Sequence, residues 1–528
     1  MTITMVNDEQ VVGKVNLKRI APSSGESFFT SSSLSPTANT VYDRNIDAGL
    51  DQNATSPDSN IGTNTSANET RYIPPWTQPY IIGVAGLSGS GKTSVASKII
   101  EELNTPWTVL ISLDNFYNPL TPEERETAFS NEFDFDSPSA VDLDLCYECV
   151  KSLKEGNKTK IPVYSFSKHD RTDKEITIYG ANVIIIEGIY ALYHQKLVDL
   201  MNLKIYVDTD LDICLARRLS RDILYRGRDL EGALKQWSTF VKPNADLFVK
   251  STMQQADLVI PRGADNYIAI DMMIKHIQKQ LLRKSREHLK YLEKLNNSLN
   301  KVELKNIINL IVLKETNQIS AINTILTNKA TSIDDFIFFF NRISSILISK
   351  ALELLTYKPS DIPIITPTNV PVDNALEVVE EAIAVNIIRS GDCFMNSLKR
   401  THPEIKIGKL LIQSDRKTGE PQLHSIMLPK NVGDKSLKKK ILLMDAQIIS
   451  GAAVIMSIQV LLDHGVTMED IIIVCYSATE QGTRRILAAF SKVKIVLARI
   501  GSMDGRNKEC DNDWWFRTRY IDTMYYGT

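Results

Sequence analysis

The chain opens with a polar segment that carries no sustained hydrophobic period. Residues 1 to about 72 are rich in Ser, Thr, Asn, Gly and Asp, as in SSGESFFTSSSLSPTANT and SPDSNIGTNTSANET. A segment of this kind cannot bury enough apolar surface to offset the entropy lost on ordering. We therefore expect residues 1–75 to form a disordered N-terminal tail.

From Pro79 the pattern changes to short apolar runs that alternate with amphipathic stretches. Strand character, meaning β-branched residues bounded by turns, is found in YIIGVAG (80–86), VLISLD (109–114), VIIIEGI (183–189), LKIYVD (203–208) and ADLVIP (256–261). Strands that alternate with helices favour a parallel sheet with helices on both faces. We assign residues 76–285 to a first α/β domain.

A charged amphipathic stretch separates this domain from a second one. Between about Tyr267 and Leu313, apolar residues recur at three- and four-residue spacing among many charges, which predicts a long helix. We assign residues 286–315 to a helical linker. Alternating strands and helices then return, as in AVNIIRSG, KIGKLLIQS, KKILLMDAQIISGAA, DIIIVCYSAT and KVKIVLARI, and predict a second α/β domain over residues 316–528.

Bulk properties exclude several classes of protein. At 528 residues the chain is long enough for two or three domains. Its net charge of -2 argues against a nucleic-acid or acidic-membrane partner. The N-terminus lacks a signal-peptide pattern, and six dispersed cysteines fit reduced thiols. We expect a cytoplasmic protein with no membrane segment, and the basic run KSLKKK leaves entry into the nucleus open.

The first predicted strand leads into a phosphate-binding loop. The pattern GxxxxGK[ST] is formed by Gly86, Leu87, Ser88, Gly89, Ser90, Gly91, Lys92 and Thr93. Its glycines let successive N–H groups point at a β-phosphate, in front of a helix N-terminus. Lys92 is expected to neutralise phosphate charge, and the Thr93 hydroxyl to bind Mg²⁺. The motif predicts nucleotide binding without choosing among kinases, GTPases and motors.

Asp114 follows the second predicted strand, where a parallel sheet presents its ligand crevice. A carboxylate there can accept a proton from an attacking hydroxyl. Considered alone, a turn aspartate is an equally good interpretation.

Further segments follow in order, and together they resemble the uridine–cytidine kinase family from about residue 79 to 280. They are DNFY, FDFDSP, IPVYSF, IIIEGI, RRLSRDILYRGRD, TFVKP and IPRGADN. The resemblance implies a P-loop NTPase-type kinase domain that phosphorylates uridine and cytidine to UMP and CMP in pyrimidine salvage. Phosphoribulokinase-like or pantothenate-kinase-like chemistry shares the loop and the acid, but the last two segments argue against both.

The resemblance also implies roles for individual residues. Asp114 matches the general base, Glu187 matches the Mg²⁺-associated acid, and Asp136 with Arg218 matches the pair that holds the ribose hydroxyls. The pyrimidine and sugar pocket is matched by Tyr117, Tyr164, Phe166, His169 and Gln236. A lid over ATP is matched by Arg221, Arg226 and Arg228. The family further implies a homo-oligomer, a tetramer, with feedback inhibition by UTP or CTP, while the choice between ATP and GTP stays open.

The second domain resembles uracil phosphoribosyltransferases over about 210 residues. The resemblance is carried by Ile388–Gly391, 407–413, the segment around Asp445, Ser450 and Gly451, and the terminal YYGT. It implies a phosphoribosyltransferase-like α/β fold whose loop binds a phosphoribosyl group or a nucleotide.

That loop departs from its family at several positions. Ser450, Ala452 and Ala453 replace the usual Thr, Gly and Ser, Thr327-Asn328 replace a common Arg-Asp, and the segment 501–513 lacks a GDAGD-like run. Alanine disfavours positive φ, so the loop can lose its phosphate geometry. We favour a non-catalytic or regulatory domain. The alternatives are a bifunctional enzyme that also makes UMP from uracil and phosphoribosyl diphosphate, and a nucleotide-sensing scaffold.

Overall fold

The structure, a computed structural model, describes most of the chain after residue 71. The described residues are 72–103, 105–130, 132–166, 168–226, 229–297, 304, 307–372, 374–415, 418–434, 436, 438–501 and 519–527. The predicted tail therefore lies almost wholly outside them. Within these ranges no helix combines the length and the apolar character needed to cross a bilayer.

The first domain is built on a five-stranded parallel sheet with the order β2-β5-β1-β6-β7. Its strands are β1 (Tyr80–Gly86), β2 (Thr108–Ser112), β5 (Val183–Glu187), β6 (Leu203–Asp208) and β7 (Leu258–Pro261). All five are runs that the hydrophobic pattern predicts as strands. Every side chain of β1 and β5 is buried, as expected for central strands covered on both faces.

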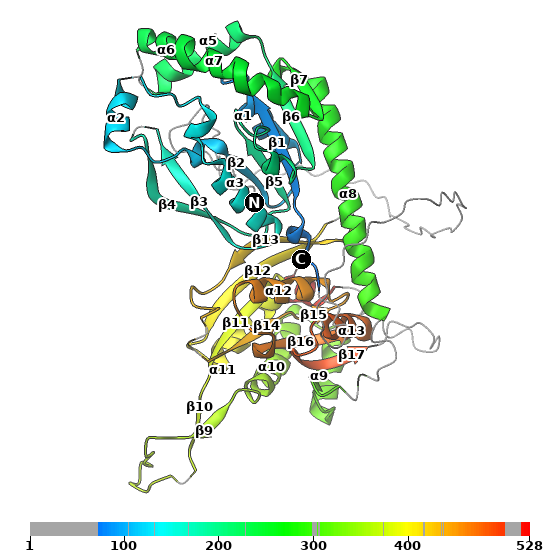
Figure 1. The fold of residues 1–528 in the computed structure, drawn as a ribbon. Coiled ribbons are helices and arrows are strands. Elements are labelled where there is room, and N and C mark those ends of the chain that lie inside the picture. The colour runs from blue at the N-terminus through cyan, green and yellow to red at the C-terminus, as the bar shows by residue number, and fades with distance from the viewer. Residues whose placement is uncertain are drawn as a thin grey trace, which may run out of the picture. The chain divides into compact units, whose positions relative to one another are not determined.

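Helices cover both faces of this sheet (Figure 1). They are α1 (Lys92–Leu103), α2 (Pro122–Phe129), α3 (Leu143–Lys154), α4 (Gln195–Val198), α5 (Leu211–Arg226), α6 (Leu230–Gln236), α7 (Lys242–Asn244) and α8 (Tyr267–Asn297). Alternate residues of β1 point into two separate apolar clusters, with Ile81 in one and Ile82 in the other. An antiparallel hairpin of β3 (Thr159–Ser165) and β4 (Asp170–Ile178) completes the domain.

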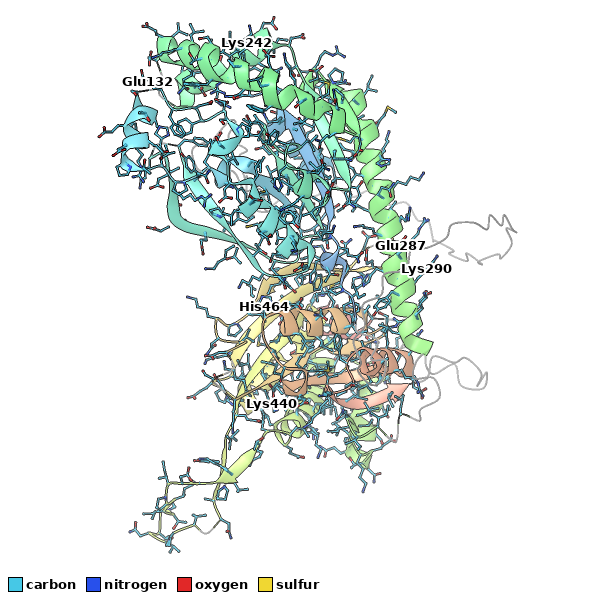
Figure 2. The ribbon with its side chains drawn as sticks, viewed as in Figure 1. Glu132, Lys242, Glu287, Lys290, Lys440 and His464 are labelled. Carbon is cyan, nitrogen blue, oxygen red and sulfur yellow. The ribbon has the colours of Figure 1, made fainter. Side chains whose placement is uncertain are left out.

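Helix α8 is the long amphipathic helix predicted from the three- and four-residue spacing. Ile274 and Ile277 are buried in a core cluster of the first domain, and Leu292 and Leu295 in one of the second. Its other face carries exposed charges such as Glu287 and Lys290 (Figure 2).

The second domain is built on a sheet with the order β13-β12-β11-β14-β16-β17-β8, to which β15 adds by pairing with β16. Among the strand pairs described in this sheet, only β12–β13 is antiparallel. The strands are β8 (Leu310–Val312), β11 (Glu381–Ile388), β12 (Lys406–Ser414), β13 (Pro421–Met427), β14 (Lys439–Met444), β15 (Gln447–Ile448), β16 (Ile471–Thr479) and β17 (Lys494–Gly501).

The helices of the second domain are α9 (Asn317–Thr327), α10 (Ile333–Leu352), α11 (Met395–Thr401), α12 (Ala452–Asp463), α13 (Glu480–Ala489) and α15 (Ile521–Tyr526). A separate hairpin joins β9 (Tyr357–Pro359) to β10 (Leu376–Val378). Helix α8 runs through residue 285, where we place the end of the first domain, and β8 lies inside the predicted linker but pairs with β17. The domain limits themselves stay predictions.

Candidate active site

The phosphate-binding loop connects β1 to α1 with the backbone conformation that its glycines predict. Gly86, Gly89 and Gly91 have φ values of 148°, 85° and 93°. A Cβ on Gly89 would lie 2.4 Å from the carbonyl oxygen of Cys214 in α5, so no larger residue fits. Helix α1 begins at Lys92, which places its N-terminus directly behind the loop.

Lys92 is buried inside this loop. Its Nζ donates a hydrogen bond to the carbonyl oxygen of Leu87 at 2.9 Å. Burial lowers the pKa of Lys92, while the negative charges of Glu187 and Asp114 act in the opposite direction. The ammonium group is thus held next to both acids that the sequence singled out.

Adjacent parallel strands bring the two acids together. Ser112 ends β2 and is paired in register with Glu187, the last residue of β5. The Ser112 hydroxyl donates to Glu187 Oε1 at 2.7 Å, and its oxygen accepts the backbone N–H of Asp114 at 3.4 Å. Asp114 lies in the short 3-10 helix Leu113–Phe116, just beyond the strand end, and Ser112 caps this helix. Ser112, which no sequence pattern selected, thus links the carboxylate of Glu187 to the backbone of Asp114.

The residues around Glu187 fit a divalent cation. Thr93 Oγ1 donates to Glu187 Oε2 at 3.3 Å, so a hydroxyl and a carboxylate oxygen adjoin the phosphate loop. Burial, together with the charge of Asp114, raises the pKa of Glu187. A buried carboxylate that resists ionisation beside a second acid is stabilised by added positive charge. Oxygen ligands of this type suit Mg²⁺.

Asp136 and Arg218 form a two-point ion pair at the other end of the pocket. Arg218 Nη1 and Nη2 donate to the two carboxylate oxygens at 3.0 and 3.1 Å, and Nη1 also donates to Ser88 Oγ at 3.0 Å. Both side chains are nearly buried. Burial by itself would lower the pKa of Arg218, but Asp136 and Asp222 raise it. The pair connects the predicted ribose site to the phosphate loop.

Aromatic rings form the wall between these two ends. Tyr117 lies 5.8 Å from Phe166 and 6.0 Å from Phe135 between ring centroids. Phe135 stacks on His169 at 5.0 Å with an interplanar angle of 23°. Tyr164 packs against Tyr117 at 5.3 Å and lies behind the wall. Flat apolar walls with a few polar groups suit a planar base.

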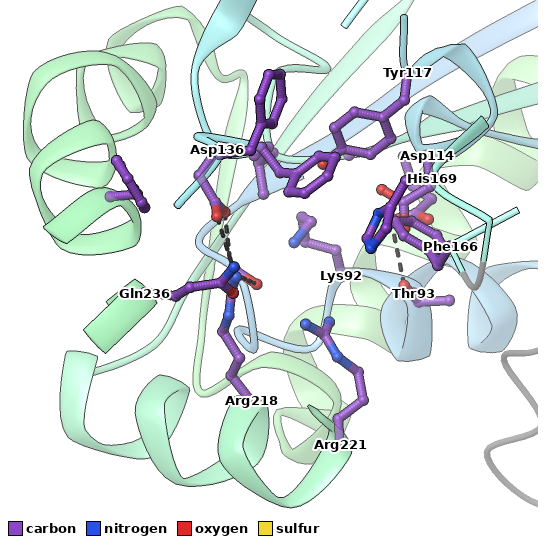
Figure 3. Close-up of a pocket in the computed structure, with 17 residues that line it drawn as sticks. Lys92, Thr93, Asp114, Tyr117, Asp136, Phe166, His169, Arg218, Arg221 and Gln236 are labelled. Carbon is purple, nitrogen blue, oxygen red and sulfur yellow. Dashed lines mark hydrogen bonds and ion pairs between the residues drawn. The ribbon is translucent and has the colours of Figure 1, made fainter. Parts of the chain in front are cut away.

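One pocket gathers most of the predicted site residues (Figure 3). It is lined by Ser88, Lys92, Thr93, Asp114, Tyr117, Asp136, Phe166, His169, Glu187, Arg218, Arg221 and Gln236. Phe133, Phe135, Gly188, Ile189 and Phe240 line it too. Sequence reasoning did not select these five, although three lie in the FDFDSP and TFVKP segments and the other two in IIIEGI. Arg228 lies outside the described residues, as does the side chain of Arg226.

The predicted phosphoribosyl loop of the second domain is also placed at a strand end. Asp445 follows β14 and is buried, and it accepts a hydrogen bond from Ser390 Oγ at 2.5 Å. Burial raises the pKa of Asp445, whereas the charge of Arg519 opposes that shift. The carboxylate thus has a side-chain partner within the fold.

The loop after Asp445 turns at a single glycine. Gly451 has a φ of 75° and caps α12, which begins at Ala452. Arg485 Nη1 donates to the carbonyl oxygen of the exposed Ser450 at 2.7 Å. Ala452 is helical, so the loop has no second left-handed residue at that position. Residues 502–513 of the predicted uracil segment lie outside the described residues.

The parallel sheet, the phosphate loop with its lysine and threonine, and a strand-end carboxylate in the same pocket define a P-loop phosphotransferase. Residues 81–269 match the Phosphoribulokinase / Uridine kinase family, and residues 312–506 match Uracil phosphoribosyltransferase.

Whole-chain relatives narrow this class further. The chain is 55% identical to a uridine kinase of Saccharomyces cerevisiae, over 88% of this chain and 91% of that protein. It is 42% identical to a uridine kinase of Schizosaccharomyces pombe, over 83% of this chain and 94% of that one. The chain is 40% identical to a uridine-cytidine kinase-like 1 of Mus musculus, over 81% of this chain and 77% of that protein. The chain belongs to the uridine kinase family, and it is a kinase.

Proposed function

We propose that the first domain transfers the γ-phosphoryl group of ATP to the 5′-hydroxyl of uridine or cytidine and forms UMP or CMP. The observation that carries this proposal is the shared pocket of Asp114, the phosphate loop and the Asp136–Arg218 pair. A base, a phosphate cradle and a ribose clamp in one cavity are what a riboside kinase needs.

Asp114 accepts the proton of the 5′-hydroxyl while the hydroxyl oxygen attacks the γ-phosphorus and ADP leaves. Lys92 and Arg221 neutralise charge on the phosphate oxygens, and positioning supplies much of the rate. Mg²⁺ near Thr93 and Glu187 supplies further charge neutralisation when it is bound with the nucleotide. Gly188 and Ile189 line the same pocket.

The Asp136–Arg218 pair gives a physical reason for preferring ribosides. Both charges are nearly buried, so the hydroxyls of a ribose replace water as hydrogen-bond partners. A 2′-deoxyriboside leaves a polar group of the site without its partner. Family resemblance completes the proposal. The phosphate donor is ATP, with GTP as the alternative, and Mg²⁺ is the metal ion. UTP or CTP inhibits the enzyme by feedback, and the protein is a homo-oligomer.

The test is formation of the 5′-monophosphate by the purified full-length protein from ATP and uridine or cytidine. Asp114→Ala should lower kcat by about 100-fold to 10,000-fold, because general base catalysis is lost. Asp271→Asn is the matched control, since Asp271 is an exposed partner of Lys275 on α8. Wild-type protein that makes no product from either nucleoside would overturn the proposal.

A second activity is favoured by one observation, the strand-end acid Asp445 beside Ser390 in a domain that matches uracil phosphoribosyltransferases. The covered carboxylate and the single left-handed residue of the loop favour a non-catalytic role instead. Pyrophosphate release from uracil and phosphoribosyl diphosphate, measured in parallel, separates a bifunctional enzyme from a kinase with a regulatory domain.

A further inference from the structure

Asp222 is a buried carboxylate that the proposed reaction does not yet use. It lies on α5 one helical turn after Arg218 and directly after Arg221, and its side chain is only 1% exposed. It is not among the described residues that line the pocket. A carboxylate this deeply buried needs positive partners, because removal from water strongly disfavours its charged form.

Two arginines of the pocket are its partners, one on each carboxylate oxygen. Arg221 Nε donates to Asp222 Oδ1 at 3.0 Å. Arg218 Nε forms an ion pair with Oδ2 at 3.5 Å. The Nη atoms of Arg218 stay available for Asp136, to which they donate at 3.0 and 3.1 Å. Asp222 therefore contacts the stem side of Arg218 and leaves the end of the guanidinium for the pocket.

The two arginines serve different ends of the pocket (Figure 3). Arg218 reaches Asp136 at the predicted ribose site, and it also donates to Ser88 at the edge of the phosphate loop. Arg221 lies close enough to Lys92 for its charge to contribute to the lowered pKa of that lysine, to which burial contributes most. The carboxylate that fixes both is shared between the nucleoside side and the phosphate side.

Helix α5 gives this arrangement a rigid base. The carbonyl oxygen of Cys214, one turn before Arg218, lies against Gly89 of the phosphate loop so closely that a Cβ there would approach it to 2.4 Å. Arginine side chains lose much rotamer freedom when they are held in one geometry. A buried acid that holds both before substrate binds reduces the ordering cost of the reactive complex.

We propose that Asp222 is a positioning residue that orients Arg218 for the nucleoside and Arg221 for the phosphoryl group. The inference rests on the proposed phosphorylation of a pyrimidine riboside. It assigns to one side chain a double effect, on nucleoside binding through Arg218 and on phosphoryl transfer through Arg221.

The test is steady-state kinetics of Asp222→Asn in the full-length protein, with ATP and uridine. We expect KM for uridine to rise about tenfold and kcat to fall about tenfold, since small misplacements of catalytic groups cost up to about 100-fold in rate. Asp271→Asn is the matched control, because it breaks an exposed ion pair of the same i,i+4 spacing and should change neither constant. Wild-type kinetics for Asp222→Asn would overturn the inference.

Double-mutant cycles distinguish positioning from a general loss of structure. In an Arg221→Ala background the kcat effect of Asp222→Asn should shrink to about twofold, and in an Arg218→Ala background its KM effect should shrink likewise. Equal effects in all backgrounds would overturn the inference. If the Asn variant does not melt cooperatively, Asp222→Glu enters the same cycles, since it keeps the charge and displaces the carboxylate by one methylene. Inactive wild-type protein would instead count against the proposed function.

Discussion

The two sheets of this chain place an acid at the same kind of position and use it differently. Asp114 follows β2 in the first domain and lines an open pocket with Lys92 and Arg221. Asp445 follows β14 in the second domain and is buried against the Ser390 hydroxyl. The carboxyl end of a parallel sheet offers a ligand site, but the side chains packed around an acid decide whether it can act on a ligand.

Of three further substitutions that test how acids act in the two domains, Asp136→Asn should have the largest effect. The amide cannot balance the charge of Arg218, so we expect kcat/KM for uridine to fall about 100-fold. The preference for uridine over 2′-deoxyuridine should shrink in the same variant, because the ribose clamp is lost. Kinetics with both nucleosides measure the ratio, and an unchanged ratio would show that Asp136 does not select ribosides.

Ser112→Ala should have a smaller effect that depends on pH. Burial and Asp114 raise the pKa of Glu187, whereas the hydrogen bond from Ser112 lowers it, so removal of the hydroxyl raises that pKa further. Glu187 must be ionised to bind a cation, hence the acidic limb of the kcat profile should move to higher pH. At neutral pH we expect kcat to fall roughly threefold to tenfold.

The pH dependence of kcat, measured beside Ser238→Ala, checks this expectation. Ser238 is exposed and donates to backbone carbonyls of its own helical segment. An acidic limb at the wild-type position in Ser112→Ala would show that the Ser112 hydroxyl does not tune Glu187.

Asp445→Asn should have the smallest effect on the kinase, with kcat/KM for uridine within about twofold of wild type. Its effect is expected in stability instead. Burial raises the pKa of Asp445, so its contribution to stability is present at low pH and is lost as pH rises through the raised value. Between about pH 4 and pH 7, the melting temperature of the Asn variant should therefore fall less than that of the wild type.

Thermal melting across that range, with kinase assays on the same samples, measures both quantities. A fall of tenfold or more in kinase activity would show that the second domain controls the first. A melting profile identical to that of the wild type would show that Asp445 is not the buried titrating group.

Local sequence signals predicted the elements that local physics dictates. The runs 80–86 and 183–189 are fully apolar or nearly so, and they became central strands because such runs are stable only when buried on both faces. The phosphate loop was predictable because its glycines are required by positive φ values and by the close approach of Cys214. Asp136 and Arg218 entered through family resemblance, and the structure joins them by two hydrogen bonds.

Contacts between distant segments were not predictable in this way. The pairing of β8 with β17 depends on residues 185 positions apart, and three apolar residues give a weak strand signal. Tyr164 carries an aromatic signal that does not say whether the ring faces the pocket or packs behind Tyr117.

The sequence by itself determined a parallel-sheet kinase domain, its phosphate loop and its strand-end acids, because backbone conformation and side-chain periodicity are encoded within a few residues. Only the tertiary structure decided that Ser112 joins Asp114 to Glu187, that Asp222 is shared by two arginines and that Asp445 is covered. The physical reason is that a buried polar group is defined by the partners that reach it, and those partners are assembled by folding.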